Sequence, residues 1–127
     1  MVEEIRDLTN GGVDYAIDLA GVIQAMNTAY QIIRYGGSVV TAGLSPINTQ
    51  FSFNHSDLVA QEKSILGSYM GSCVPVRDVP RFLNLYKQGR LPVDKLIDGK
   101  ITFDNLNEGF DKLSKGEVVR QILVPNS

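Results

Sequence analysis

Few side chains in this sequence are suited to nucleophilic or metal chemistry. A hydrolytic triad needs an imidazole base, and the single histidine, His55, is followed directly by Ser56. Adjacent residues do not form a nucleophile and base pair by themselves, so we interpret His55 as a solvated or capping residue of a polar loop. One cysteine, Cys73, and one histidine do not supply the ligands of a zinc site, and we expect no metal site in this chain.

Two aspartates have a spacing that could support acid–base chemistry. Asp14 and Asp18 lie four residues apart in one apolar run, which places both on the same face of a strand. Paired carboxylates can act as acid and base, but a carboxylate in such a place more often caps or binds a neighbouring backbone group. We therefore favour a structural role for one of them.

Glycines punctuate the sequence without forming a phosphate-binding loop. Gly11-Gly12, Gly36-Gly37 and the pair Gly67 and Gly71 match neither G-x-G-x-x-G nor G-x-x-x-x-G-K-[ST]. No segment of this chain is therefore predicted to cradle a phosphate by itself.

Helical and strand patterns alternate through the first half of the chain. A short helix over 2–8 stops at Asn10-Gly11, and an apolar strand over 13–20 leads to a helix over 23–33. Gly36-Gly37 is expected to end that helix before a second buried strand over 38–44. A polar connection with a helical turn or two near 57–61 leads to a third apolar run over 64–72.

The second half repeats the alternation with shorter elements. An apolar face around Val79 and Tyr86 predicts a helix with Pro80 in its first turn and a stop at Gly89. A brief strand, an N-cap at Asp104, a helix ending at Gly116 and a final strand over 118–124 follow. Such alternation predicts a doubly wound α/β fold with a parallel sheet, whose ligands bind outside the carboxyl ends of the strands.

Composition narrows the classes of partner. The chain has 127 residues, 43% of them hydrophobic, and its formal charge is −2 from 12 Lys and Arg against 14 Asp and Glu. No basic field is available for nucleic acid or for an anionic membrane surface, and no apolar run approaches the ~18 residues of a membrane span. With a single cysteine and an acidic first segment, we expect a cytoplasmic protein.

Five segments in order resemble the C-terminal part of zinc-dependent medium-chain alcohol dehydrogenases. They are GGVDYAIDLAG, IIRYGGSVVTAGLSP, KSILGSYMGS, LPVDKLI and ITFDNLNEGFDKLSKGEVVRQILVP, and the similarity runs from about Val2 to Pro125. The resemblance implies a single partial Rossmann domain over 1–127, carrying strands four to six. It also implies a closing helix and strand over 100–127 that rejoin the catalytic domain in the full-length family.

The resemblance also implies cofactor contacts. It puts Leu19 and Ala20 along the adenosine ribose of NAD or NADP, and Arg120 at the pyrophosphate. The residues implied to support or close over the nicotinamide are Ala42, Gly43, Leu44, Ser68, Tyr69 and Met70.

Simpler interpretations of these residues stay open at this point. Leu44 and Met70 could belong to the core, Gly43 could only turn the chain, and Arg120 could be an ordinary surface residue of a strand.

The remainder of the implied site would lie upstream of Met1, including the glycine-rich turn and the zinc ligands of the parent catalytic domain. Three charge-assisted hydrogen bonds of roughly 1.5–3 kcal/mol each would be missing, a loss of about three to six orders of magnitude in affinity. We therefore expect this chain alone to bind the dinucleotide weakly and to be inactive. The parent would transfer hydride between an alcohol and nicotinamide.

Unpaired strand edges suggest an alternative to a cofactor-binding fragment. Removing the neighbour of the strand over 13–20 would leave an apolar edge, and the family dimerises through the strand that corresponds to 64–71. We expect a homo-oligomer through one of these edges. The alternative function is a non-catalytic interaction module, while a receiver-like domain is less favoured because acids do not cluster at adjacent strand ends.

Overall fold

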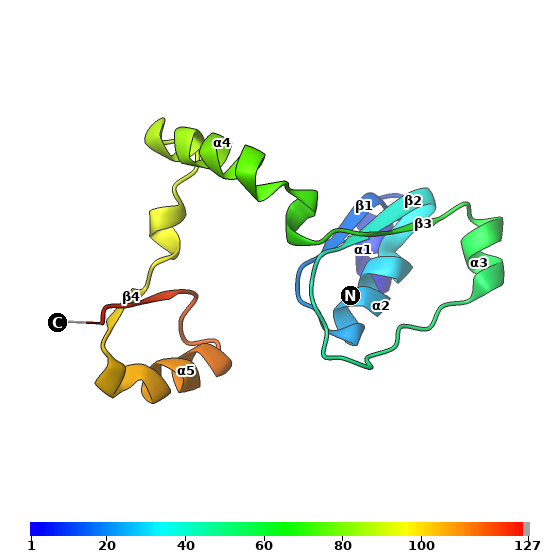
Figure 1. Cartoon of the computed structure of the whole chain (residues 1–127). Helices are drawn as coiled ribbons and strands as arrows, with labels where there is room; N and C mark the ends of the chain where they lie inside the picture. The colour runs from blue at the N-terminus through cyan, green and yellow to red at the C-terminus, as the bar shows by residue number, and fades with distance from the viewer. Residues whose placement is uncertain (126–127) are drawn as a thin grey trace. The chain divides into compact units, whose positions relative to one another are not determined.

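Two units, each with its own parallel sheet, make up the computed structural model, which describes residues 1–125 (Figure 1). Unit 1 comprises Met1–Cys73, and unit 2 begins at Val74. The predicted α/β class with parallel strands is confirmed in both units. Whether 1–127 is one nucleotide-binding domain with a closing segment over 100–127 stays a prediction.

Unit 1 is a three-stranded parallel sheet with helices. Its strands lie in the order β1-β2-β3, so β1 and β3 form its two edges. The elements are α1 (Val2–Leu8), β1 (Val13–Asp18), α2 (Ile23–Ile32), β2 (Ile33–Thr41), α3 (His55–Ala60), β3 (Ser64–Gly67) and a 3-10 turn over Met70–Ser72.

The core of unit 1 lies between α2 and the sheet. Ile33 and Val39 of β2 are completely buried, and α2 turns three side chains toward them. The polar connection before α3 also contributes, because Phe51 and Phe53 pack around the ring of Tyr30. The buried hydrophobic residues are Ala16, Met26, Ala29, Tyr30, Ile33 and Val39.

The second strand begins earlier than the sequence pattern predicts. β2 starts at Ile33, directly after α2, and Gly36-Gly37 lies inside it instead of ending the helix. The register between β1 and β2 shifts at this point, where the Gly36 N–H donates to the carbonyl of Gln61. A Cβ at Gly37 would lie 2.9 Å from the Arg34 carbonyl and 3.1 Å from the Val13 carbonyl of β1. The glycine pair therefore fits an irregularity of the strand, a bulge, that leaves no room for a side chain at Gly37.

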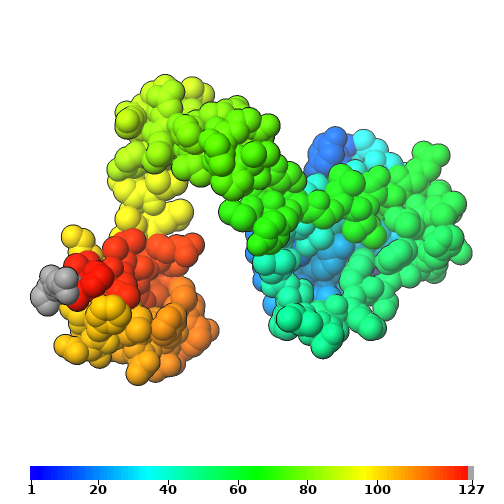
Figure 2. All heavy atoms as spheres, viewed as in Figure 1, coloured from blue at the N-terminus to red at the C-terminus, as the bar shows by residue number. Residues whose placement is uncertain are grey.

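Unit 2 combines a two-stranded parallel sheet with two longer helices. In Figure 2 the orange atoms of α5 lie against the red atoms of the β5 segment, and the Gln121 amide donates to the Gly109 carbonyl of α5. Its elements are α4 (Pro75–Lys87), a 3-10 turn over Val93–Leu96, β4 (Gly99–Ile101), a 3-10 turn over Phe103–Asn105, α5 (Leu106–Ser114) and β5 (Gln121–Leu123).

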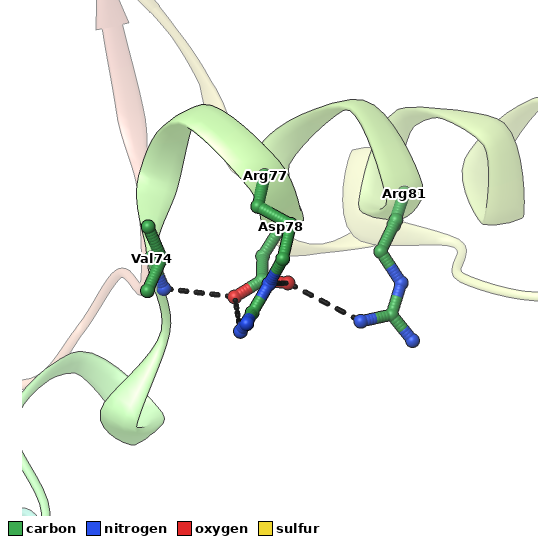
Figure 3. Close-up of polar contacts among 4 residues, drawn as sticks. All are labelled: Val74, Arg77, Asp78 and Arg81. Carbon is green, nitrogen blue, oxygen red and sulfur yellow. Dashed lines mark hydrogen bonds and ion pairs between the residues drawn. The ribbon is translucent and has the colours of Figure 1, made fainter.

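Helix α4 starts at Pro75, so the prediction that Pro80 lies in the first turn is wrong. The carboxylate of Asp78 accepts the backbone N–H of Val74 at 2.8 Å and binds the guanidinium groups of Arg77 and Arg81 (Figure 3). The bond between the Asp78 carboxylate and the Val74 N–H stabilises the start of the helix, four residues before Asp78. Pro80, which cannot donate a backbone hydrogen bond, is accommodated inside it.

Two further boundaries in unit 2 differ from the sequence pattern. The N-cap of α5 is Asn105, and the predicted cap Asp104 lies in the preceding 3-10 turn. The final strand covers only Gln121–Leu123, so Arg120 precedes it. In the part of the chain that the structure describes, no helix is long and apolar enough to cross a membrane.

Candidate functional site

The carboxyl ends of the three strands of unit 1 meet at one edge of the sheet. Asp18 of β1 lies opposite Thr41 of β2, and Thr41 lies opposite Gly67 of β3. The strands are parallel, so the residues that follow them leave the sheet side by side (Figure 1). We call the segments that directly follow the strands the exits: residues 19–21 after β1, 42–44 after β2 and 68–70 after β3. Eight of the nine predicted cofactor residues lie in these three exits.

Two of the exits pack backbone against backbone. A Cβ on Gly43 would collide with the backbone of Gly21 and Ala20, and a Cβ on Gly21 would meet the backbone of Leu44. The hydroxyl of Ser45 donates to the Gly21 carbonyl at 2.8 Å. Gly43 is therefore required by a close approach between two chain segments, beyond any role in turning the chain.

A buried aspartate joins the same two exits. The carboxylate of Asp18 accepts the Ala20 N–H and the Thr41 hydroxyl, each at 2.9 Å. Its carbonyl accepts the N–H groups of Ala42 at 2.8 Å and Gly43 at 3.2 Å. The expected structural role of one aspartate is confirmed, and the sequence pattern did not indicate Thr41 as its partner.

The other aspartate of the pair takes no part in this network. The exposed carboxylate of Asp14 accepts the Arg34 Nε–H at 2.7 Å and pairs with the same guanidinium through Nη2. Because Asp14 and Asp18 bind different partners, the structure gives them no shared proton or ligand.

A shallow cavity of about 350 Å³ lies at the ends of β2 and β3. Leu44 and Tyr69 are 76% and 70% exposed at its rim, and a Cβ on Gly67 would meet no atom within 4 Å. This volume is within the lower part of the ~300–1,000 Å³ range of small-molecule sites. The residues that line it are Thr41, Ala42, Gly43, Leu44, Gly67, Ser68 and Tyr69.

Three of the eight predicted residues of unit 1 lie outside that cavity. Leu19 and Ala20 line a separate groove of about 640 Å³ between β1 and α2. Met70 begins the 3-10 turn after β3 and is exposed, as Leu44 is, so neither belongs to the core. The structure thus brings together Ala42, Gly43, Leu44, Ser68 and Tyr69 in one cavity.

The ninth predicted residue, Arg120, lies in unit 2. The Asp98 carboxylate accepts the N–H of Arg120 at 2.9 Å and that of Val119 at 2.5 Å, while the Asp98 N–H donates to the Arg120 carbonyl at 2.8 Å. The two bonds that the carboxylate accepts, chiefly the one from the Arg120 N–H and then the one from Val119, hold the pKa of Asp98 below its usual value. The Arg120 backbone is thereby held just before β5.

The remaining chemically versatile residues do not form a second cluster. His55 opens α3 directly after the cap Asn54, whose side chain accepts the N–H groups of the next turn. Cys73 is a free, half-buried cysteine. Across residues 1–125, no three His, Cys, Asp or Glu side chains lie close enough together to hold a metal ion.

Comparison with known proteins decides the family. The family model described as "Zinc-binding dehydrogenase" matches residues 1–88. The chain belongs to the zinc-binding dehydrogenase family. It is 33% identical over 122 residues to alcohol dehydrogenase 1 of Cenchrus americanus, covering 95% of this chain and 32% of that protein.

Solved structures of dehydrogenases share the fold. Benzyl alcohol dehydrogenase from Acinetobacter calcoaceticus superposes with a TM-score of 0.86 at 28% identity, over 98% of this chain and 34% of that one. A zinc-binding dehydrogenase from Sinorhizobium meliloti 1021, bound to NADP, gives 0.73 at 26% identity, over 93% and 33%. The predicted resemblance and the partial Rossmann-like fold are confirmed.

This zinc-binding dehydrogenase chain spans about a third of the length of the curated relative and of the solved structures that it matches. The activity of the longer proteins therefore does not transfer to it directly.

Proposed function

We propose that this chain supplies the nicotinamide-facing part of an NAD(P) site in an alcohol dehydrogenase-like oxidoreductase. The observation that carries the proposal is the cavity at the ends of β2 and β3, which gathers five of the predicted cofactor residues. Its position outside the carboxyl ends of parallel strands is where dinucleotide-binding sheets hold their ligands. The NADP-bound relative of the same fold supports the cofactor class.

The residues present are suited to one flat ring. Leu44 and Tyr69 offer apolar surface at the rim, and the lack of a side chain at Gly67 leaves room between the strand ends. A bound nicotinamide would supply the carbon that accepts or donates hydride, while this chain would orient the ring. No cluster of metal ligands occurs in the described residues, so no step is assigned to zinc.

The rest of the dinucleotide site is proposed to lie in the longer protein. No glycine-rich phosphate loop occurs in this sequence, and Arg120 is proposed to meet the pyrophosphate. The isolated chain should then bind NADH no more tightly than the millimolar range, because about three charge-assisted hydrogen bonds are missing.

Calorimetry with NADH tests the affinity, with Arg120→Ala as the control. We expect no heat of binding in the micromolar range for either protein. Micromolar binding that Arg120→Ala weakens would contradict the proposal that the site is incomplete in this chain.

A residue-resolved titration tests the location. Backbone amide shifts of the chain are followed on addition of millimolar nicotinamide mononucleotide and, separately, AMP. We expect nicotinamide mononucleotide to move the amides of Gly43, Leu44 and Ser68 more than AMP does. Leu44→Ala should weaken this response, whereas Ile47→Ala, a 93% exposed residue of the same connection outside the cavity, should not. Equal responses to both nucleotides would contradict the proposal.

A non-catalytic interaction module is the second candidate. Tyr15 and Ile17, both largely exposed on one face of β1, favour it, because β1 is an edge strand without a further neighbour in the described sheet. A folded chain that self-associates but shows no nicotinamide response would favour this candidate over the first.

A further inference from the structure

Asp18 accepts four hydrogen bonds at the point where the ends of β1 and β2 lie side by side. Only 5% of its surface is exposed. Its carboxylate binds Ala20 in the exit from β1 and the Thr41 side chain at the end of β2, while its carbonyl binds the first two amides of the exit from β2. One residue thus fixes the starting direction of two of the three exits.

The four bonds act on the candidate site from outside the cavity. Asp18 does not line the cavity at the ends of β2 and β3, but Thr41, Ala42 and Gly43 do. Because a carboxylate accepts hydrogen bonds and does not donate them, the Thr41 hydroxyl must direct its hydrogen toward Asp18. The rotamer of Thr41 at the cavity wall therefore depends on this carboxylate, while the amides of Ala42 and Gly43 depend on the Asp18 carbonyl.

The position of Gly43 makes small displacements costly. Its backbone already lies against that of Gly21 with no room for a Cβ, so the exit from β2 cannot shift toward β1. If the bonds to Asp18 were lost, Ala42 and Gly43 could move only outward, into the cavity or away from the sheet. The Asp18 carbonyl, which accepts both N–H groups, opposes that movement directly, and the bond from Thr41 to the Asp18 carboxylate holds the residue before them.

We infer that Asp18 is a positioning residue for the nicotinamide, acting through Thr41 and through the amides of Ala42 and Gly43. The inference rests on the proposed function, since it assigns the ligand of the cavity to the nicotinamide ring. It assigns no contact between Asp18 and the ligand. An effect on binding should therefore appear without loss of the sheet itself.

The test compares Thr41→Val with Thr41→Ser in the full chain. Valine removes the hydroxyl that binds Asp18 and keeps the shape, whereas serine retains the hydroxyl. Amide shifts are followed during titration with millimolar nicotinamide mononucleotide, and hydrogen exchange of the buried Val39 amide reports on the sheet. Asp18→Asn is a second variant, because an amide oxygen can still accept the Ala20 N–H.

We expect Thr41→Val to weaken the nicotinamide response by about fivefold, the equivalent of one buried hydrogen bond, with Val39 exchange unchanged. Thr41→Ser should restore the response, and Asp18→Asn should lie between the two. This pattern would support positioning, because a merely structural role would instead accelerate Val39 exchange.

Besides accelerated Val39 exchange, two outcomes would overturn the inference, and they differ from each other. If the unchanged chain responds to nicotinamide mononucleotide and both Thr41→Val and Asp18→Asn respond equally well, the positioning role is wrong and the proposed function stands. If the unchanged chain gives no response at the strand ends, the proposed function fails, and the inference fails with it.

Discussion

Units 1 and 2 of this chain are stabilised by different means. Every buried hydrophobic side chain among residues 1–125 lies in unit 1, where α2 covers a parallel sheet. The buried positions described in unit 2 are Asp78 and Gly109, and its apolar residues are at least partly exposed. The carboxylates of Asp78 and Asp98 bind backbone N–H groups in this unit.

The difference shows which part of the chain can hold a site in place. Burial of apolar surface stabilises unit 1, so its strand ends can be positioned within the chain itself. Unit 2 leaves Phe110, Leu113 and Val119 exposed beside a cavity of about 250 Å³ between α5 and β5. We therefore expect the residues at the ends of β1 to β3 to keep their geometry under destabilising conditions in which the backbone near Arg120 loses its own.

Self-association is the largest expected effect, and it tests whether an edge strand of unit 1 pairs with a second copy of the chain. We expect at least a dimer by light scattering at micromolar concentrations, through the edge of β1 or of β3. Ile17→Lys or Leu66→Lys, each an exposed position on one edge, should yield a monomer and so identify the edge that pairs. A monomer of the unchanged chain across that range would contradict the prediction.

Ile33→Ala should destabilise unit 1 and leave the stability of unit 2 unchanged. Ile33 is fully buried, so its truncation should lower the free energy of unfolding of unit 1 by about 2–5 kcal/mol. Hydrogen exchange measured by mass spectrometry should accelerate in β1 to β3 and remain unchanged in α5. Leu113→Ala, at a half-exposed position of α5, serves as the control and should leave unit 1 unaffected. Equal acceleration in both units by Ile33→Ala would mean that they unfold together.

Gly43→Ala should disturb the site more than a neighbouring glycine does. The new Cβ would meet the backbone of Gly21, and overpacking of this kind costs about 1–3 kcal/mol. Gly67→Ala is the matched control, because its Cβ would enter open space at the end of β3. Thermal unfolding should show a loss for the first variant only. A similar loss for both would argue against the close packing of the two exits.

Asp98→Asn should loosen the Arg120 segment without affecting unit 1. The neutral amide can accept fewer and weaker hydrogen bonds than the carboxylate that holds the Val119 and Arg120 N–H groups. We expect faster amide exchange at these two positions and unchanged exchange at Val39. Protected amides in the variant would show that β4 and β5 hold this segment without Asp98.

Acid should weaken α4 before it affects the core of unit 1. The Arg77 guanidinium and the Val74 N–H lower the pKa of Asp78 to about 2, below the value of about 3.9 for an unfolded aspartate. A lowered folded pKa stabilises the folded state above the unfolded value, and this stabilisation is lost as pH falls from about 4 toward about 2. Amide exchange in α4 should therefore accelerate over this window. Asp78→Asn should abolish the pH dependence, whereas Asp111→Asn in α5 should leave it intact.

The sequence pattern predicted strands and helices well where local chemistry dominates. Asn10, with φ of 52°, stops α1 as expected, and Gly89 and Gly116, both with φ of 71°, follow α4 and α5. The exits at 19–21 and 42–44 follow β1 and β2 directly, because apolar strand runs end at a polar or glycine residue. These features depend on residues within one turn of each other.

The errors arise where a distant partner decides the local structure. Gly36-Gly37 has the composition of a helix stop, but Gln61 and Val13 make it a bulge within β2. Neither partner of the glycine pair can be identified from the residues beside it. The start of α4 differs, because the bond between Asp78 and Val74 is local, joining residues only four apart, and the helix that it begins continues through Pro80.

The sequence by itself determined the family and the parallel α/β class, and it predicted a ligand site at the strand ends. Only the tertiary structure decided that Ala42 to Leu44 share a cavity with Ser68 and Tyr69, while Leu19 and Ala20 face another groove. It also decided that Asp18, and not Asp14, joins β1 to Thr41. Spacing along a strand specifies the face on which a side chain lies, but its hydrogen-bond partner depends on which strand packs beside it.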